Sequence, residues 1–228
     1  LGAFAQGQTA SLISEGKTVC HGLWLDSRHV LTLASCVNGD EAKSLESISV
    51  EGIRIQKVSI HPGFLKTPTS RTWTGAAELS PWDVAMLTLQ GERKTKHEAT
   101  MILSPEDLAK QTNRNLRVQS ESGEFEVQKQ NSGQKHLAEK ITTSNPAELI
   151  LGTPLTYGNE VWGLSAQPQS SWNPWSTQKI YQALPLPHLA SWILNQIQEK
   201  TNAGDIEESI VRVDNPDGSC TGTLVSYR

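Results

Sequence analysis

Residues 20–36 of the 228-residue chain, CHGLWLDSRHVLTLASC, place two apolar runs between two cysteines. The first run covers 22–25, the second covers 30–34, and a polar triplet at 26–28 separates them. Two short apolar runs joined by a polar turn are typical of a β-hairpin. The ends of such a hairpin lie close together, so Cys20 and Cys36 are near enough to form a disulfide.

The overall composition is that of an ordinary globular protein, with 36% hydrophobic and 19% charged residues. A net charge of −4 gives the chain no general attraction for nucleic acid or for anionic membranes. No apolar run approaches the roughly 20 residues that a membrane-spanning helix needs. We therefore expect neither a nucleic-acid partner nor a membrane-spanning segment.

Short apolar segments alternate with turn residues along most of the chain. A period of two over 46–60, broken near Gly52, predicts strands with a bulge or turn between them, and the apolar run 84–89 predicts a buried strand. A convincing helical pattern occurs at 187–200, and a helical turn is expected at 104–107. Many short strands with one C-terminal helix favour an all-β barrel or sandwich. The remaining strand candidates are 8–14, 116–118, 125–127, 149–151, 161–164 and 180–184.

The hairpin at 20–36 resembles the opening hairpin of trypsin-like serine proteases, whose pattern runs Cys-Gly-Gly-(Thr/Ser)-Leu-Ile and then Val-Leu-Thr-Ala-Ala-His-Cys. Two further stretches, IHPGF at 60–64 and WDVAMLTL at 82–89, resemble other motifs of that family. The resemblance covers about residues 8–200. It implies an all-β fold of two antiparallel six-stranded β-barrels with a C-terminal α-helix. It also implies a Cys20–Cys36 disulfide and a secreted or extracellular location.

Catalysis in this family needs a nucleophilic serine, a histidine base and an aspartate that orients the histidine. Asp83 matches the aspartate motif, but Ser35 stands at the histidine position. A serine hydroxyl has no accessible pKa near 7 and cannot serve as the base. The nucleophile motif, Gly-Asp-Ser-Gly-Gly-Pro-Leu, aligns with LILGTPL at 149–155, which puts Leu151 at the nucleophile position.

Two more departures agree with these losses. Ile150 stands where the family has the carboxylate that pairs with a new N-terminus, and the first residues, LGAF at 1–4, depart from Ile-Val-Gly-Gly. Apolar residues at such positions avoid the cost of burying a charge. We therefore expect a pseudoprotease whose degenerate triad positions are Ser35, Asp83 and Leu151. The resemblance then implies a protein-binding, regulatory or scaffold role, with an active protease or a neighbouring protease-like domain among the partners it suggests.

The last residues repeat the spacing of the opening hairpin. CTGTLVSYR at 220–228 matches CHGLWLDSR at 20–28 in its Cys-x-Gly start, its largely apolar centre and its final arginine. This repeat predicts a trypsin-like domain at 1–200, a linker at 201–207 and the start of a second such domain at 208–228. The partner of Cys220 would then lie beyond the given sequence. Arg228 would be either the end of a fragment or a site cleaved after arginine.

Two other functions remain open. The chain could be an active serine hydrolase with an unconventional group, for which Ser35, Ser144, Ser165 or a histidine would have to serve. It could also be a non-enzymatic protein that binds a polyanion or glycan. His29 and His61 lie near the triad motif but are interpreted as surface or packing residues. No zinc-ligand spacing and no phosphate-binding loop is evident, so we expect no cofactor and no metal.

Overall fold

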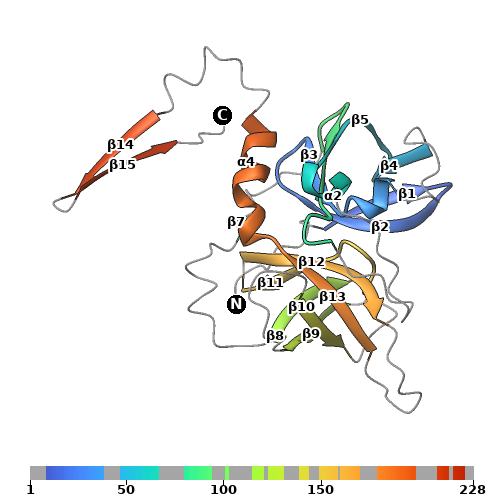
Figure 1. Ribbon diagram of the computed structural model, residues 1–228. Coiled ribbons are helices and arrows are strands. Elements are labelled where there is room, and N and C mark those ends of the chain that lie inside the picture. The colour runs from blue at the N-terminus through green and yellow to red at the C-terminus, as the bar shows by residue number, and fades with distance from the viewer. Residues whose placement is uncertain are drawn as a thin grey trace. The chain divides into compact units, whose positions relative to one another are not determined.

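The computed structural model describes residues 9–38, 47–66, 80–93, 101–102, 115–120, 123–130, 139–143, 149–158, 160–169, 179–198, 210–215 and 218–223 (Figure 1). The chain separates into two compact units, Leu1–Ser191 and Trp192–Arg228.

The first half of the larger unit is a closed antiparallel barrel in the order β1-β2-β3-β6-β5-β4 (Figure 1, blue to green). Tight turns with positive φ join β1 to β2 at Glu15-Gly16 and β4 to β5 at Glu51-Gly52, so the predicted break near Gly52 is a turn. Short helices follow β3 and β5. The elements are β1 (Thr9–Ser14), β2 (Lys17–Trp24), β3 (His29–Thr32), α1 (Ser35–Asn38), β4 (Ile48–Val50), β5 (Ile53–Ile60), α2 (Pro62–Lys66) and β6 (Ala85–Leu89).

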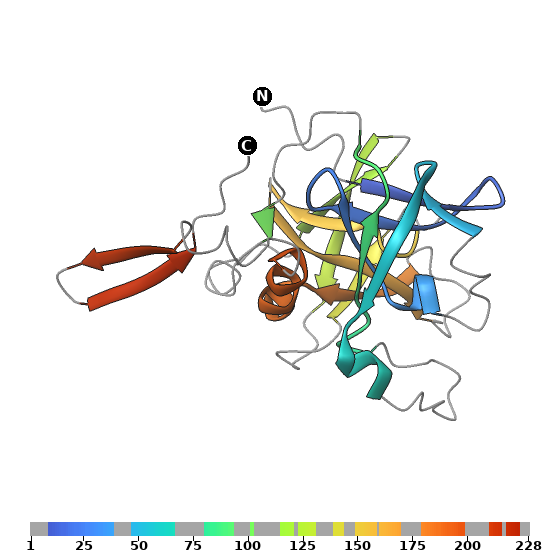
Figure 2. The same ribbon diagram turned by 90° about the horizontal axis from the view of Figure 1, so that it is seen from above.

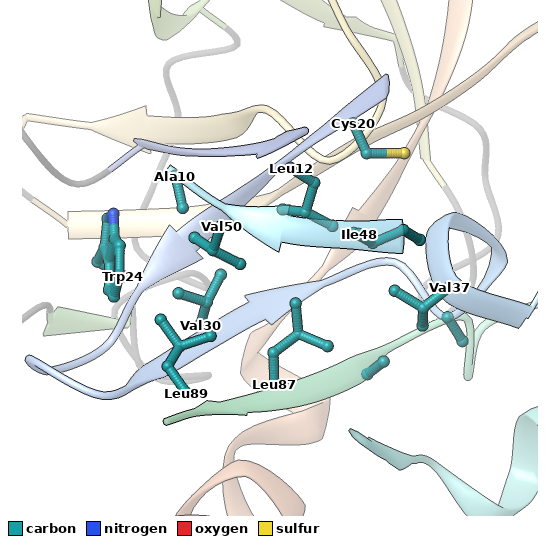
Figure 3. Packing of buried hydrophobic residues seen from close by; sticks show 12 residues of the cluster. Ala10, Leu12, Cys20, Trp24, Val30, Val37, Ile48, Val50, Leu87 and Leu89 are labelled. Atoms are coloured by element: carbon teal, nitrogen blue, oxygen red, sulfur yellow. The ribbon is translucent and has the colours of Figure 1, made fainter. Parts of the chain in front are cut away.

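Alternate residues of these strands point into the barrel and form its core. Figure 3 shows Val30, Val50, Leu87 and Leu89 facing one another, with Trp24 at one side. Each of these side chains has 0% of its surface exposed. Burial of this apolar surface is the main stabilising term for the barrel.

The second half of the unit is a six-stranded antiparallel barrel in the order β11-β8-β9-β10-β13-β12, closed by pairing of β11 with β12 (Figure 2, yellow-green to orange). A short strand, β7, adds a parallel pairing to β12. The core of this second barrel surrounds the fully buried Trp162. The strands are β7 (Met101–Ile102), β8 (Asn115–Ser120), β9 (Gly123–Gln130), β10 (Glu139–Thr143), β11 (Pro154–Tyr157), β12 (Glu160–Gln169) and β13 (Lys179–Pro185).

The predicted fold class is therefore confirmed: two six-stranded antiparallel barrels are followed by a C-terminal helix. That helical segment consists of the 3-10 turn η2 (Pro187–Leu189) and α4 (Ala190–Gln198). The predicted disulfide joins Cys20 to Cys36, with Cα atoms 6.2 Å apart. None of the described helices has the length and apolar character needed to cross a membrane.

One strand prediction is wrong. Residues 149–151 were expected to form a strand, but they form a turn, and β11 begins only at Pro154. The apolar run at 149–151 arises because these side chains are buried or half-buried, rather than because they belong to a sheet. The predicted helical turn at 104–107 lies outside the described residues.

The second unit holds most of α4 and an antiparallel hairpin, β14 (Ile210–Asn215) and β15 (Gly218–Thr223). In β15, Cys220 lies opposite Val213 and Gly222 lies opposite Val211. In β2, Cys20 lies opposite Leu12 and Gly22 lies opposite Ala10. The repeated Cys-x-Gly thus occupies the second strand of a hairpin in both places, although the register of β1–β2 shifts between Leu12 and Ile13. The domain boundaries and the linker at 201–207 stay predictions.

Candidate functional site

Ser35 and Asp83, two of the three predicted triad positions, are hydrogen-bonded to each other. Ser35 follows β3 and Asp83 precedes β6, and these two strands are neighbours that pair Thr32 with Ala85. The pairing brings the two side chains together although 48 residues separate them in sequence. The backbone N–H of Ser35 donates to Asp83 Oδ1 at 2.7 Å, and Ser35 Oγ donates to Oδ2 at 2.8 Å.

The carboxyl group of Asp83 is buried, with 3% of the residue exposed. Burial raises the pKa of Asp83, and hydrogen bonds from the Ser35 backbone, the Ser35 hydroxyl and the Ala34 backbone oppose that rise without cancelling it. The Ser35 hydroxyl therefore stabilises the ionised acid. It cannot accept and return a proton near pH 7, so this pair lacks the chemistry of an aspartate–histidine pair.

Leu151, the third predicted triad position, lies in the turn that precedes β11. Its half-buried side chain packs against the core of the first barrel. The next residue, Gly152, has a φ of +81°, and a Cβ there would collide with the carbonyl oxygen of His21. Only glycine fits at this point, where the turn passes against β2. The turn thus presents a hydrocarbon side chain where the family pattern has its nucleophile.

Hydrogen bonds to His21 and Ser165 tie this turn to both barrels. On the first barrel, His21 donates its backbone N–H to the Leu151 carbonyl at 2.7 Å, and its Nδ1 lies 2.9 Å from Thr153 Oγ1. On the second barrel, Ser165 Oγ donates to the Ile150 carbonyl at 2.6 Å, and Gly152 donates its N–H to the Ser165 carbonyl at 2.7 Å. Thr153 Oγ1 also donates to the Ile150 carbonyl at 2.7 Å. Since Thr153 Oγ1 gives its only proton to that carbonyl, it accepts the proton on His21 Nδ1.

No model of a known protein family matches the chain, and no curated protein matches it either. The trypsin-like resemblance accordingly rests on the motifs and on the two barrels.

Sequence reasoning missed the pairing of His21 with Thr153. Both residues stand where the family patterns have glycine, in Cys-Gly-Gly and in Gly-Gly-Pro, and they are 132 positions apart. The available signal in the sequence was that His21 and Thr153 each replace a glycine of the family patterns. Neither departure alone indicates that the two side chains meet.

The other candidate nucleophiles receive no support from the described geometry. Ser165 is fully buried and its hydroxyl donates to a backbone carbonyl, so it is not positioned to attack a substrate. Ser144 lies outside the described residues, as do the first eight residues of the chain and Arg228. Within the described parts of the chain, no group of three or more His, Cys, Asp and Glu residues could hold a metal ion.

His29 is a buried residue, in agreement with its interpretation as a surface or packing residue. Its Nδ1 lies 2.7 Å from Asp26 Oδ2 in the turn between β2 and β3. Burial acts to raise the pKa of Asp26, but hydrogen bonds from His29 and from the Arg28 backbone outweigh it and lower that pKa. The pair closes the hairpin turn and is separate from the Ser35–Asp83 pair.

Proposed function

We propose that this chain is a catalytically inactive serine-protease homologue that works as a protein-binding, regulatory or scaffold domain. The observation that carries the proposal is the Ser35–Asp83 pair. The acid is retained and buried, but its hydrogen-bond partner is a hydroxyl that cannot act as a general base.

The surroundings of Leu151 support the same function. An acyl-transfer site needs an exposed hydroxyl or thiol beside a base. At the matching position this chain has an alkyl side chain that packs against the first barrel's core. The cross-barrel hydrogen bonds of His21, Thr153 and Ser165 satisfy the polar groups around it. The turn is therefore built to be stable without catalytic residues.

A binding role follows from what the fold offers once catalysis is lost. Loops held on rigid β-barrels are common recognition surfaces, and they do not depend on a catalytic group. A disulfide such as Cys20–Cys36 persists in oxidising compartments, which supports secretion and an extracellular protein as the partner. An active protease or a neighbouring protease-like domain is a partner of the right class.

The experiment is a hydrolysis assay with peptide amides and activated esters, run on the full chain beside an active trypsin-like protease. Loss of triad residues lowers turnover by roughly 10⁶-fold in serine proteases, so we expect the chain to be slower than the active enzyme by about that factor. The matched variant carries Ser35→His and Leu151→Ser, which restores a base beside Asp83 and a hydroxyl in the turn. Hydrolysis by the unaltered chain within about 10³-fold of the active enzyme, abolished by Asp83→Asn, would refute the proposal.

A further inference from the structure

Three aromatic rings from separate segments of the larger unit meet beside the Asp83 turn. Trp82 stacks on His61, with ring centroids 4.7 Å apart and planes inclined by 8°. His188 meets the same indole edge-on, at 5.9 Å. His61 follows β5, Trp82 precedes β6, and His188 belongs to η2, which follows the second barrel.

The hydrogen bond to His61 fixes which of its nitrogens carries a proton. The backbone N–H of Gly63 donates to His61 Nδ1 at 3.0 Å, so Nδ1 is an acceptor and the neutral ring carries its proton on Nε2. A second proton would have to bind at Nδ1. The new N–H would then point at the N–H of Gly63, and this hydrogen bond would be lost.

His188 differs from His61 in this respect. Its Nε2 lies 3.2 Å from the carbonyl oxygen of Pro81, which can only accept, so Nε2 is the donor. A proton added at Nδ1 leaves that bond intact. The hydrogen bond to Gly63 therefore opposes protonation of His61, whereas the bond from His188 to Pro81 does not oppose protonation of His188. Burial lowers the pKa of His61, and the neighbouring positive charge of His188 lowers it further.

On the segments that pack against His61, the described titratable side chains are His188 and Asp83, and the Asp83 carboxylate is held by Ser35 and Ala34. On β5, which precedes His61, the charged side chains are Arg54 and Lys57, both exposed. Neither of these cations favours a positive charge on His61.

Close packing makes the stack sensitive to the position of His61. A Cβ on Gly63 would come within 2.6 Å of Trp82 Cγ, so the indole lies directly against the backbone of α2. The backbone N–H of His61 also donates to the Val84 carbonyl at 3.0 Å, next to Asp83. Movement of the imidazole therefore changes the contacts of Trp82, which is bonded to the residue that carries the buried acid.

We propose that His61, Trp82 and His188 form an acid-sensitive latch, in which a proton taken from solvent by His61 Nδ1 breaks the bond to the Gly63 amide and releases the Trp82 indole. The latch closes at neutral pH and opens at mildly acidic pH. The contacts of the Trp82–Asp83 turn and of η2 then depend on the pH of the surroundings. This inference is independent of the proposed function, since it requires only that the three rings meet.

The test is an NMR titration of the full chain between pH 8 and pH 5, following the His61 ring, the Gly63 amide and the nuclear Overhauser effects between His61 and Trp82. We expect His61 to titrate below the ordinary histidine pKa, the Gly63 amide shift to follow the same curve, and the His61–Trp82 effects to disappear as His61 becomes charged. The latch would be overturned if the His61–Trp82 nuclear Overhauser effects persisted with His61 protonated. It would also be overturned if His61 titrated at or above the ordinary histidine pKa.

Two variants make the test specific. His61→Gln keeps an oxygen that can accept from Gly63 but cannot titrate, so the Trp82 signals should no longer change between pH 8 and pH 5. An unchanged pH response of Trp82 in this variant would refute the latch. His188→Gln keeps a donor for the Pro81 carbonyl but carries no charge, and it should raise the midpoint of His61. Failure to raise it would contradict the part assigned to His188.

Discussion

Replacing Ser35 by alanine removes one of the donors that hold the buried carboxylate of Asp83. The Ser35 and Ala34 backbone groups stay in place, so the variant isolates the hydroxyl bond of 2.8 Å. That bond joins a neutral donor to an ionised acceptor inside the protein. Hydrogen bonds of this kind contribute about 1.5–3 kcal/mol.

The expected loss is about 2 kcal/mol of unfolding free energy at pH 7. The loss should depend on pH. The folded-state pKa of Asp83 is raised above its unfolded value of 3.8. The unfolding free energy therefore falls as the pH rises from 3.8 through the folded-state pKa. Loss of the Ser35 hydroxyl raises that pKa further and widens this window. Below pH 3.8 the acid is protonated in both states, and the variant should cost about 1 kcal/mol or less.

The assay is urea unfolding of both proteins at pH 7 and at pH 3.5, followed by tryptophan fluorescence. A loss of 2 kcal/mol shifts the midpoint by roughly 0.7 M when the urea slope is about 3 kcal/mol/M. In an Asp83→Asn background, Ser35→Ala should cost about 1 kcal/mol at both pH values, because no charge remains. An equal loss at both pH values in the unaltered background, or a loss under about 0.5 kcal/mol at pH 7, would refute the argument.

Two further substitutions test the turn at 149–153. Gly152→Ala should lower the unfolding free energy by more than about 2 kcal/mol, because Gly152 has a φ of +81° and the added Cβ would collide with the His21 carbonyl. The control is Gly158→Ala, where φ is +57° and the space is open, and it should lower the unfolding free energy by only about 1 kcal/mol. Similar losses in the two glycine variants would contradict the close approach. Thr153→Val removes the bonds to His21 and to the turn and should cost about 2–3 kcal/mol, whereas Thr156→Val loses one longer bond of 3.3 Å and should cost under about 1 kcal/mol. Urea unfolding at pH 7 measures all four, and equal losses in the two threonine variants would argue against the cross-barrel bond.

The sequence was most informative where local patterns determine local structure. The apolar runs around 26–28 predicted the β2–β3 hairpin, and the spacing of Cys20 and Cys36 predicted the disulfide. The helical pattern after Pro187 predicted η2 and α4. Each of these depends on residues that are close together in the chain, so periodicity and turn residues suffice.

Prediction failed where distant segments decide the outcome. The turn at 149–151 is held by bonds from Ser165 to the Ile150 carbonyl and from His21 to the Leu151 carbonyl, and no local pattern contains that information. β10 is absent from the strands that the sequence predicts, although Ile141 is fully buried. The contact of Ser35 with Asp83 requires the pairing of β3 with β6, which periodicity alone could not supply.

The central proposal is that this chain has no activated nucleophile, and the mass of the intact protein after treatment with a fluorophosphonate tests it most directly. The folded chain should keep its unmodified mass, while an active trypsin-like protease in a parallel reaction gains one probe adduct. The variant with Ser35→His and Leu151→Ser shows whether the same turn can support labelling once a base and a hydroxyl are present. A stoichiometric adduct on the folded, unaltered chain, absent after heat denaturation, would contradict the account.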